Sequence, residues 1–126
     1  MKKLRRYWME IHGSSNMKRN IEKAIQRAVV DFVRKSYPQI IIHATSNEHS
    51  YDKHNDYCVG IPDLLLFSPC GKVLFLELKT LTGKLNKNQI AWNKFFDKNF
   101  TASNYKRAVA YGFIQAQEII ADWHIT

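Results

Sequence analysis

The amino-acid sequence predicts an α/β domain in which helices cover both faces of a mixed β-sheet. Three features of the chain lead to this fold class. A helix with one apolar face opens the regular part of the chain, two apolar strands lie at its centre, and a helix, a strand and a helix follow. The 126 residues suffice for one domain with a core, and their hydrophobic content of 45% is that of a folded chain.

The first predicted helix covers residues 17–36. Apolar residues recur in it at spacings of three and four and make one face: Ile21, Ala24, Ile25, Ala28, Val29, Phe32 and Val33. Asn16 or Asn20 is expected to cap the helix, and Pro38 follows its end. Glu22 falls at the edge of the apolar face. Such a glutamate usually only borders a core, but here it becomes a candidate because a site is expected on the neighbouring sheet.

Two apolar strands, 63–68 and 72–79, form a hairpin at the centre of the chain. The turn residues Ser68-Pro69-Cys70-Gly71 join them. Both strands are apolar on both faces, which predicts that they lie in the interior of the sheet. Three charged residues interrupt this pattern: Asp63, Glu77 and Lys79. Since side chains alternate along a strand, Glu77 and Lys79 share one face, and the hairpin brings Asp63 near Glu77.

These charged residues indicate a nuclease-type site. Two carboxylates and a lysine on an apolar sheet are costly to bury unless something compensates them. A divalent cation between the carboxylates would compensate them, and the lysine would then act on a water molecule. The alternative interpretation is structural: an exposed ion pair on the second strand and a Pro-Asp pair that only opens a turn.

The hairpin loop decides whether the two carboxylates can meet. Asp63 faces Glu77 only if Phe67 pairs with Val73 around a loop of five residues. A loop of four residues would pair Asp63 with Leu76 and turn Glu77 to the other face. We therefore predict either the longer loop or a β-bulge near the site.

The charge balance of the chain favours a polyanionic partner. Nineteen basic and eleven acidic residues give a net charge of +8, which indicates nucleic acid before membrane. No run is apolar enough to span a bilayer or to serve as a signal peptide, so we expect a cytoplasmic protein. Cys58 and Cys70 match no metal-finger spacing and are expected to be reduced and non-catalytic.

Residues 1–16 form a basic arm, which we separate from a folded domain over residues 17–126. Its Lys, Arg, Tyr and Trp side chains could touch phosphate and stack on a base, or the arm could be a solvated tail. After a predicted strand over residues 39–45, a polar loop runs to residue 60. We consider two functions for this loop: its side chains could bind zinc, or they could contact a nucleic-acid strand. The zinc set is His43, His49, His54 and Cys58, and the nucleic-acid set is Asn47, His49, Lys53 and Asn55.

A basic loop, residues 80–86, follows the hairpin and leads to a helix over residues 87–99. Asn86 is its expected cap, and Lys84 and Lys87 are candidate phosphate contacts. Gln89 lies in the first turn and can point back to the strand end that carries the site. Ile90, Ala91, Trp92 and Phe95 are expected to pack inward. A strand over residues 105–111 and a helix over residues 113–123 complete the predicted domain.

The ordered set of these residues resembles the VRR-NUC domain, the virus-type replication-repair nuclease domain of the PD-(D/E)XK superfamily. The similarity runs from about residue 20 to residue 123. The matching residues are Glu22 with Gln26, Asn47-Glu48, Gly60-Ile61-Pro62-Asp63, Glu77-Leu78-Lys79, Gln89 and Gly112. Each of these motifs occurs often by chance, whereas their order along the chain, together with the domain size, is specific for this family. The basic arm is the departure from the family pattern.

The resemblance implies a restriction-endonuclease-like fold and a metal-dependent endonuclease that acts on DNA. Asp63 and Glu77 would bind Mg²⁺ or Mn²⁺ together with the backbone carbonyl of Leu78, and Glu22 would approach as a further ligand. Lys79 would orient or deprotonate the attacking water, and Gln89 would position a neighbouring group or the scissile phosphate.

The resemblance also implies a homodimer that acts on branched DNA, including four-way junctions, in a phage or prophage context. The competing interpretation is a non-catalytic nucleic-acid-binding module with the same fold. The buried charges argue against such a module, since binding alone has no need of them.

Overall fold

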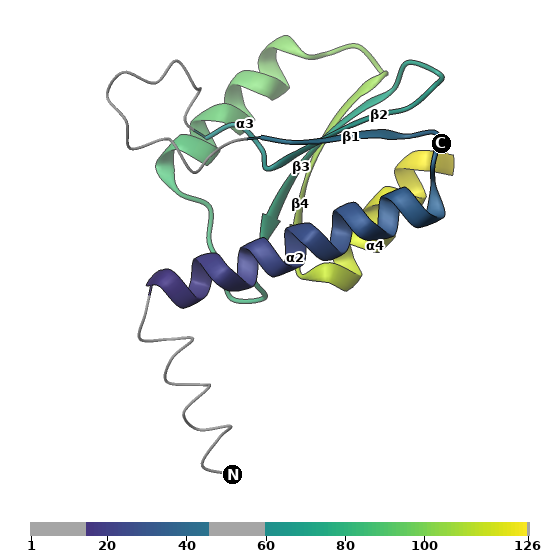
Figure 1. Ribbon diagram of the computed structural model, residues 1–126. Helices are drawn as coiled ribbons and strands as arrows, with labels where there is room; N and C mark the ends of the chain where they lie inside the picture. Colours follow the sequence, from purple (N-terminus) through teal and green to yellow (C-terminus); the bar gives the residue numbers. More distant parts are fainter. Residues whose placement is uncertain (1–14, 46–59, 126) are drawn as a thin grey trace.

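The computed structural model describes residues 15–45 and 60–125 (Figure 1). The described residues form three helices and four strands. The helices are α2 (Ser15–Ser36), α3 (Lys87–Asn99) and α4 (Phe113–Ile125). The strands are β1 (Ile41–Ala44), β2 (Leu64–Phe67), β3 (Val73–Lys79) and β4 (Tyr105–Tyr111). The predicted α/β fold, a mixed sheet with helices on both faces, is therefore confirmed.

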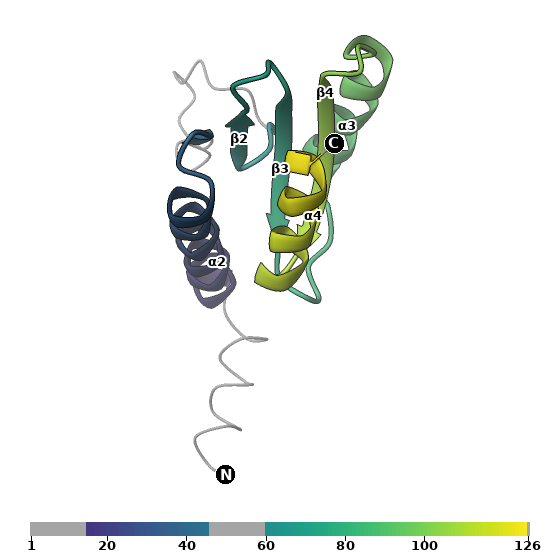
Figure 2. The same ribbon diagram turned by 90° about the vertical axis from the view of Figure 1, so that its right-hand side faces the viewer.

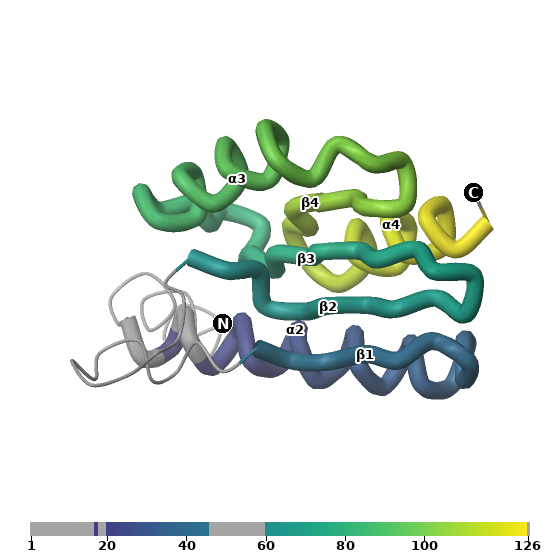
Figure 3. The backbone as a smooth tube through the Cα atoms, turned by 90° about the horizontal axis from the view of Figure 1, so that it is seen from above, coloured from purple at the N-terminus to yellow at the C-terminus, as the bar shows by residue number. Residues whose placement is uncertain are grey.

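The sheet has the strand order β1-β2-β3-β4, and Figure 3 shows the strands side by side. The pairs β1–β2 and β2–β3 are antiparallel, whereas β3 and β4 are parallel and are connected through α3. The apolar strands β2 and β3 both lie inside the sheet, as their sequences predicted. Their interior position explains why charged residues on β3 are buried.

The core lies between the sheet and the pair of helices α2 and α4, which pack against each other (Figure 2). Leucines at alternate positions of β2 and β3 point into this layer because strand side chains alternate between faces. The largest fully buried side chains of this core are Val29, Val33, Leu64, Leu66, Leu74, Leu76, Leu78 and Ile120. Burying side chains of this size typically stabilises a fold by about 1.5–3 kcal/mol each before the entropic cost is subtracted.

The other face of the sheet is covered by α3, through a cluster of aromatic rings. Phe75 of β3 lies 5.1 Å from the Phe96 ring and 6.0 Å from the Trp92 ring, measured between centroids. Phe100 completes the contact, with its centroid 5.7 Å from that of Phe75. Glu77 and Lys79 follow Phe75 on the same face of β3, so α3 and the site share one side of the sheet.

Two details of the predicted helices are wrong. The first helix begins at Ser15, so Asn16 and Asn20 lie inside it and cannot be its N-cap. Met17, Lys18 and Arg19 are good helix formers, which allows the helix to extend past both asparagines. In α3 the predicted inward residues Ile90, Ala91 and Phe95 are exposed, whereas Phe96 is buried. The correct face could not be chosen from the sequence because the run Trp92–Phe100 offers aromatic side chains in several directions.

Candidate active site

The hairpin register brings Asp63 opposite Glu77. Phe67 pairs with Val73 and Leu64 with Leu76, so the loop contains the five residues 68–72. The loop is closed by Ser68 N–H, which donates to the carbonyl of Lys72 (2.9 Å). One step beyond Leu64 and Leu76, this register places Asp63 beside Glu77 on the α3 face. The predicted five-residue loop is confirmed, and no bulge is needed.

Asp63 is fixed by backbone hydrogen bonds on both of its neighbouring strands. Its carboxylate oxygen Oδ2 accepts a hydrogen bond from the backbone N–H of Leu78 (2.8 Å). Its backbone carbonyl accepts one from Thr45 N–H (2.8 Å), and the Thr45 hydroxyl donates to the carbonyl of Pro62 (2.7 Å). These bonds hold the Pro-Asp segment between the end of β1 and β3, so its carboxylate is part of the sheet rather than of a free turn.

Glu77 is a buried carboxyl group with one satisfied oxygen. The residue is only 5% exposed, and its Oε1 accepts a hydrogen bond from Gln89 Nε2 (2.8 Å). Its Oε2 is also buried, and within the described part of the chain it has no hydrogen-bond partner. Burial, followed by the charge of Asp63, raises the pKa of Glu77 to about 10, and Glu22 adds to this rise. In the metal-free protein Glu77 is therefore protonated at neutral pH.

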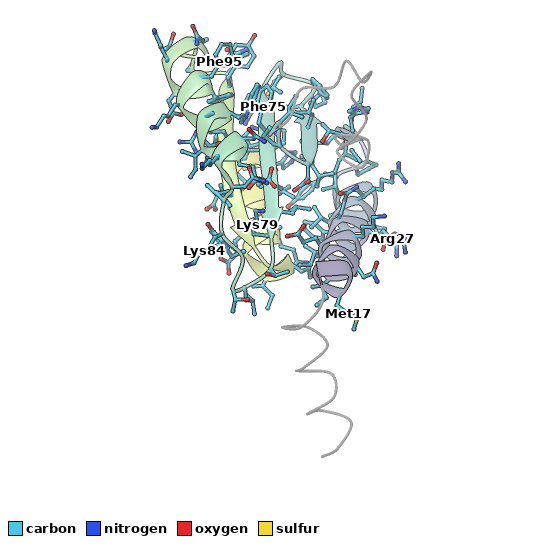
Figure 4. All side chains as sticks on the ribbon, turned by 90° about the vertical axis from the view of Figure 1, so that its left-hand side faces the viewer. Met17, Arg27, Phe75, Lys79, Lys84 and Phe95 are labelled. Atoms are coloured by element: carbon cyan, nitrogen blue, oxygen red, sulfur yellow. The ribbon has the colours of Figure 1, made fainter. Side chains whose placement is uncertain are left out.

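Lys79 lies two residues after Glu77 on the same face and is only 8% exposed. Its positive charge lowers the pKa of Glu77 and so opposes the effects of burial, Asp63 and Glu22, which raise it. A Cβ atom added at Gly83 would come 3.3 Å from Lys79 Cδ, so the loop after β3 packs on the lysine stem. Figure 4 shows Lys79 between the layers of α3 and α2. The lysine is thus a buried cation beside a carboxyl group, the arrangement that the sequence predicted.

Gln89 is held in place by the cap of α3. Asn86 Oδ1 accepts from Gln89 N–H, and Gln89 Oε1 accepts from Asn86 N–H, both at 2.9 Å. This capping box turns the Gln89 amide nitrogen towards Glu77, 2.8 Å from its Oε1. The expected cap at Asn86 and the expected direction of Gln89 are both confirmed.

Gly60 and α3 form a contact that the sequence did not reveal. Gly60 has a φ of +92°, and a Cβ atom there would lie 2.4 Å from the backbone oxygen of Asn88. Only glycine fits this conformation and this close approach. The start of the Gly60–Asp63 segment is therefore packed on the first turn of α3, the turn that carries Gln89. The available sequence signal was the glycine itself, three residues before the aspartate.

Glu22 lies on α2 and is partly buried. Its negative charge contributes to the raised pKa of Glu77, which places it within electrostatic reach of the site. Within residues 15–45 and 60–125, no three His, Cys, Asp or Glu side chains gather closely enough to hold a metal ion. A role for Glu22 as a metal ligand therefore stays a prediction, as does the role of the Leu78 carbonyl.

The Asp63–Glu77 pair fits a divalent cation. Hard cations such as Mg²⁺ prefer carboxylate oxygens, and here two carboxyl groups lie side by side on a sheet. The buried Oε2 of Glu77, without a partner in the described chain, is an oxygen that a cation would satisfy. The same cation would offset both the burial and the repulsion by Asp63 that raise the pKa of Glu77.

The remaining predicted site residues divide into two groups. Asn47, His49, Lys53, His54, Asn55 and Cys58, together with the basic arm, lie outside the described residues. Lys84 and Lys87 are both exposed beside the site, in the loop before α3 and at its first position. His43 is exposed on β1, and Cys70 is a free, exposed thiol in the hairpin loop. No described helix has the length and apolar content needed to cross a membrane.

Comparisons with known proteins agree with this fold. The family model for the VRR-NUC domain matches residues 6–113, so the match begins within the basic arm. A solved structure described as a VRR-NUC domain shares 22% sequence identity and superposes with a TM-score of 0.57. The match covers 81% of this chain and 96% of that chain, which shows the same fold. No match is found among curated proteins. Since the family model covers well over half of the residues, this chain belongs to the VRR-NUC family of nucleases.

Proposed function

We propose that this protein is a Mg²⁺- or Mn²⁺-dependent endonuclease that hydrolyses phosphodiester bonds in branched DNA. The observation that carries the proposal is the pairing of Asp63 with the buried Glu77 beside the buried Lys79, with one Glu77 oxygen left without a partner in the described chain. A purely structural ion pair would not bring two carboxyl groups together, since that arrangement disfavours the ionised forms of both.

The residues of the site have separate tasks in this mechanism. Asp63 and Glu77 would hold the cation, which when bound supplies Lewis-acid activation of the phosphate and of the attacking water. Glu77 must lose its proton to do so, and Gln89 keeps its Oε1 occupied and its Oε2 available. Lys79 would orient the attacking water or accept its proton, and its charge would stabilise the negative charge that develops on the phosphate oxygens.

Our proposals for the shape of the substrate and for the oligomeric state rest on the family resemblance alone. The resemblance supports four-way junctions as the branched substrate, a homodimer as the active form, and a phage or prophage enzyme in the host cytoplasm. The net charge of +8 supports DNA as the partner, because phosphate contacts supply most non-specific affinity.

The proposal is tested with labelled four-way junctions, flaps, duplexes and single strands in Mg²⁺, Mn²⁺ or EDTA. We expect the parent protein to cleave a branched substrate with either metal and not in EDTA, and Glu77→Gln prepared in parallel to be inactive. Equal activity of both proteins would show a contaminating nuclease or a different site. DNA binding without cleavage by the parent would favour the non-catalytic binding module.

A further inference from the structure

The helix α3 has two faces of different character. Gln89, Trp92 and Phe96 follow one another at spacings of three and four and face the sheet and the site. The opposite face carries Lys87, Lys94 and Lys98, all exposed; we call these three residues the lysine stripe. With a rise of about 1.5 Å per residue, the stripe is roughly 16 Å long.

The positive charge of the lysine stripe is not neutralised by the helix. Asp97, the acidic residue of α3, is bound by Arg107 of β4 through two hydrogen bonds of 2.7 Å each. Among the described residues, none of the three lysines forms an ion pair. A row of three such ammonium groups along one face of a helix is complementary in charge to the phosphate backbone of a nucleic acid and not to an apolar surface.

An exposed aromatic side chain lies beside the lysine stripe. Phe95 is 53% exposed, although its ring is supported from below by Trp92 (5.9 Å) and Phe100 (6.3 Å). A supported ring with an exposed surface beside lysines is an arrangement by which proteins stack an unpaired base. Figure 4 shows Phe95 and Lys84 on the α3 side of the molecule and Arg27 on the α2 side.

The first turn of α3 is fixed to the site by two contacts. Gln89 donates to Glu77, and the backbone of Asn88 packs on Gly60, so α3 cannot turn without disturbing the carboxylate pair. The lysine stripe begins at Lys87, two residues before Gln89, and runs away from the site. Lys87 is thus the end of the stripe nearest the site in sequence, and a strand seated on the stripe would pass from the first turn of α3 along its outer face.

We propose that the lysine stripe and Phe95 bind an unpaired DNA strand leaving the site, with the lysines on phosphates and Phe95 against a base. This inference deepens the proposed function and rests on it. A second copy of the chain is a poorer occupant, because a two-fold contact through this face would bring the same lysines against each other. The substrate class that results is DNA with a single-stranded arm.

Charge is tested by a matched pair of double variants. Lys94→Gln/Lys98→Gln removes two charges from the stripe, and Arg27→Gln/Arg34→Gln removes two exposed charges from α2. Binding of a forked duplex with one single-stranded arm is measured in EDTA at several salt concentrations. We expect the slope of log affinity against log salt to fall by about 1.4 in the α3 variant, for two lost phosphate contacts on a single strand. An unchanged slope in the α3 variant, or an equal change in the α2 variant, would overturn the proposal.

Stacking is tested by Phe95→Leu, which keeps an apolar side chain on Trp92 and Phe100. We expect affinity for the forked duplex to fall about tenfold and affinity for a blunt duplex of equal length to stay the same. An equal loss on both DNAs, or no loss on either, would overturn the stacking role. Failure of the proposed function has a different signature: the parent would bind the forked duplex with the expected salt slope but would not cleave it with any metal.

Discussion

Glu77 is the residue whose protonation couples the site to the stability of the fold. Its pKa is raised from 4.5 to about 10 in the folded, metal-free protein, chiefly by burial and by Asp63. Between these values the folded state keeps a proton that the unfolded chain releases. The stabilisation is therefore complete below about pH 4.5 and is lost as the pH rises through about 10.

We expect the free energy of unfolding of the metal-free parent to fall between pH 5 and pH 9, by at most about 1.4 kcal/mol per pH unit. Glu77→Gln carries no titratable group at this position and should show a flatter profile. Urea unfolding in EDTA at pH 5, 7 and 9 measures both. Parallel profiles for the two proteins would show that Glu77 is not the responsible group.

Gln89 has two hydrogen-bonding tasks that two variants can separate. Asn86→Ala and Gln89→Ala each break the capping box, and each should lower the free energy of unfolding by about 1 kcal/mol. Only Gln89→Ala removes the donor to Glu77. We expect cleavage to fall about 10- to 100-fold in Gln89→Ala and to change little in Asn86→Ala. Equal losses of cleavage would mean that Gln89 acts only through the helix cap.

Lys79 is the residue whose charge should matter for the reaction but not for the fold. Lys79→Met keeps the apolar stem against Gly83 while removing the ammonium group. We expect the variant to fold, to bind DNA and metal, and to lose about a hundredfold to ten-thousandfold in cleavage rate. Single-turnover cleavage with saturating Mg²⁺ measures this loss. A loss that higher metal concentration restores would instead assign Lys79 to cation binding.

At the scale of elements, the site depends on how the Gly60–Asp63 segment meets α3. Gly60 and Gly71 both have positive φ, +92° and +88°, but only Gly60 is packed on another backbone. We expect Gly71→Ala to lower the free energy of unfolding by about 1 kcal/mol, the usual strain of an alanine held at positive φ. Gly60→Ala should cost clearly more and should also lower cleavage, because α3 must shift and Gln89 with it.

Urea unfolding and cleavage assays on the two alanine variants test this comparison. The excess loss of stability in Gly60→Ala over Gly71→Ala measures the contact with Asn88. Similar losses in both variants, with cleavage retained, would show that α3 is not fixed through Gly60.

At the scale of the whole molecule, binding should be governed by net charge. A surface of +8 should lose DNA affinity steeply as salt rises, with a similar dependence for unrelated DNA sequences. Lys84→Gln/Lys87→Gln, beside the site, should weaken binding to all sequences roughly equally. Fluorescence anisotropy on two duplexes of unrelated sequence measures this effect. A loss confined to one sequence would instead indicate base recognition by these lysines.

Much of the fold was predictable because the signals are local. The apolar strands β2 and β3, the bounds of β4 and α3, and the cap at Asn86 all follow from periodicity and from short-range hydrogen bonding. The buried face of α3 was not predictable, because Phe95 and Phe96 are equally apolar and the choice between them depends on where Phe75 lies. In the same way, the sequence did not predict where α2 begins. The helix starts at Ser15, so it includes Asn16 and Asn20, the two asparagines that were candidates for its N-cap.

The sequence alone determined which chemical groups the site contains and, through alternation along a strand, that Glu77 and Lys79 share a face. It also limited the hairpin to two loop lengths, of which only one joins Asp63 to Glu77. The tertiary structure decided between them, and it alone set the burial that raises the pKa of Glu77 to about 10. The physical reason is that alternation and capping act over a few residues, whereas desolvation depends on the strands and helices that surround a group.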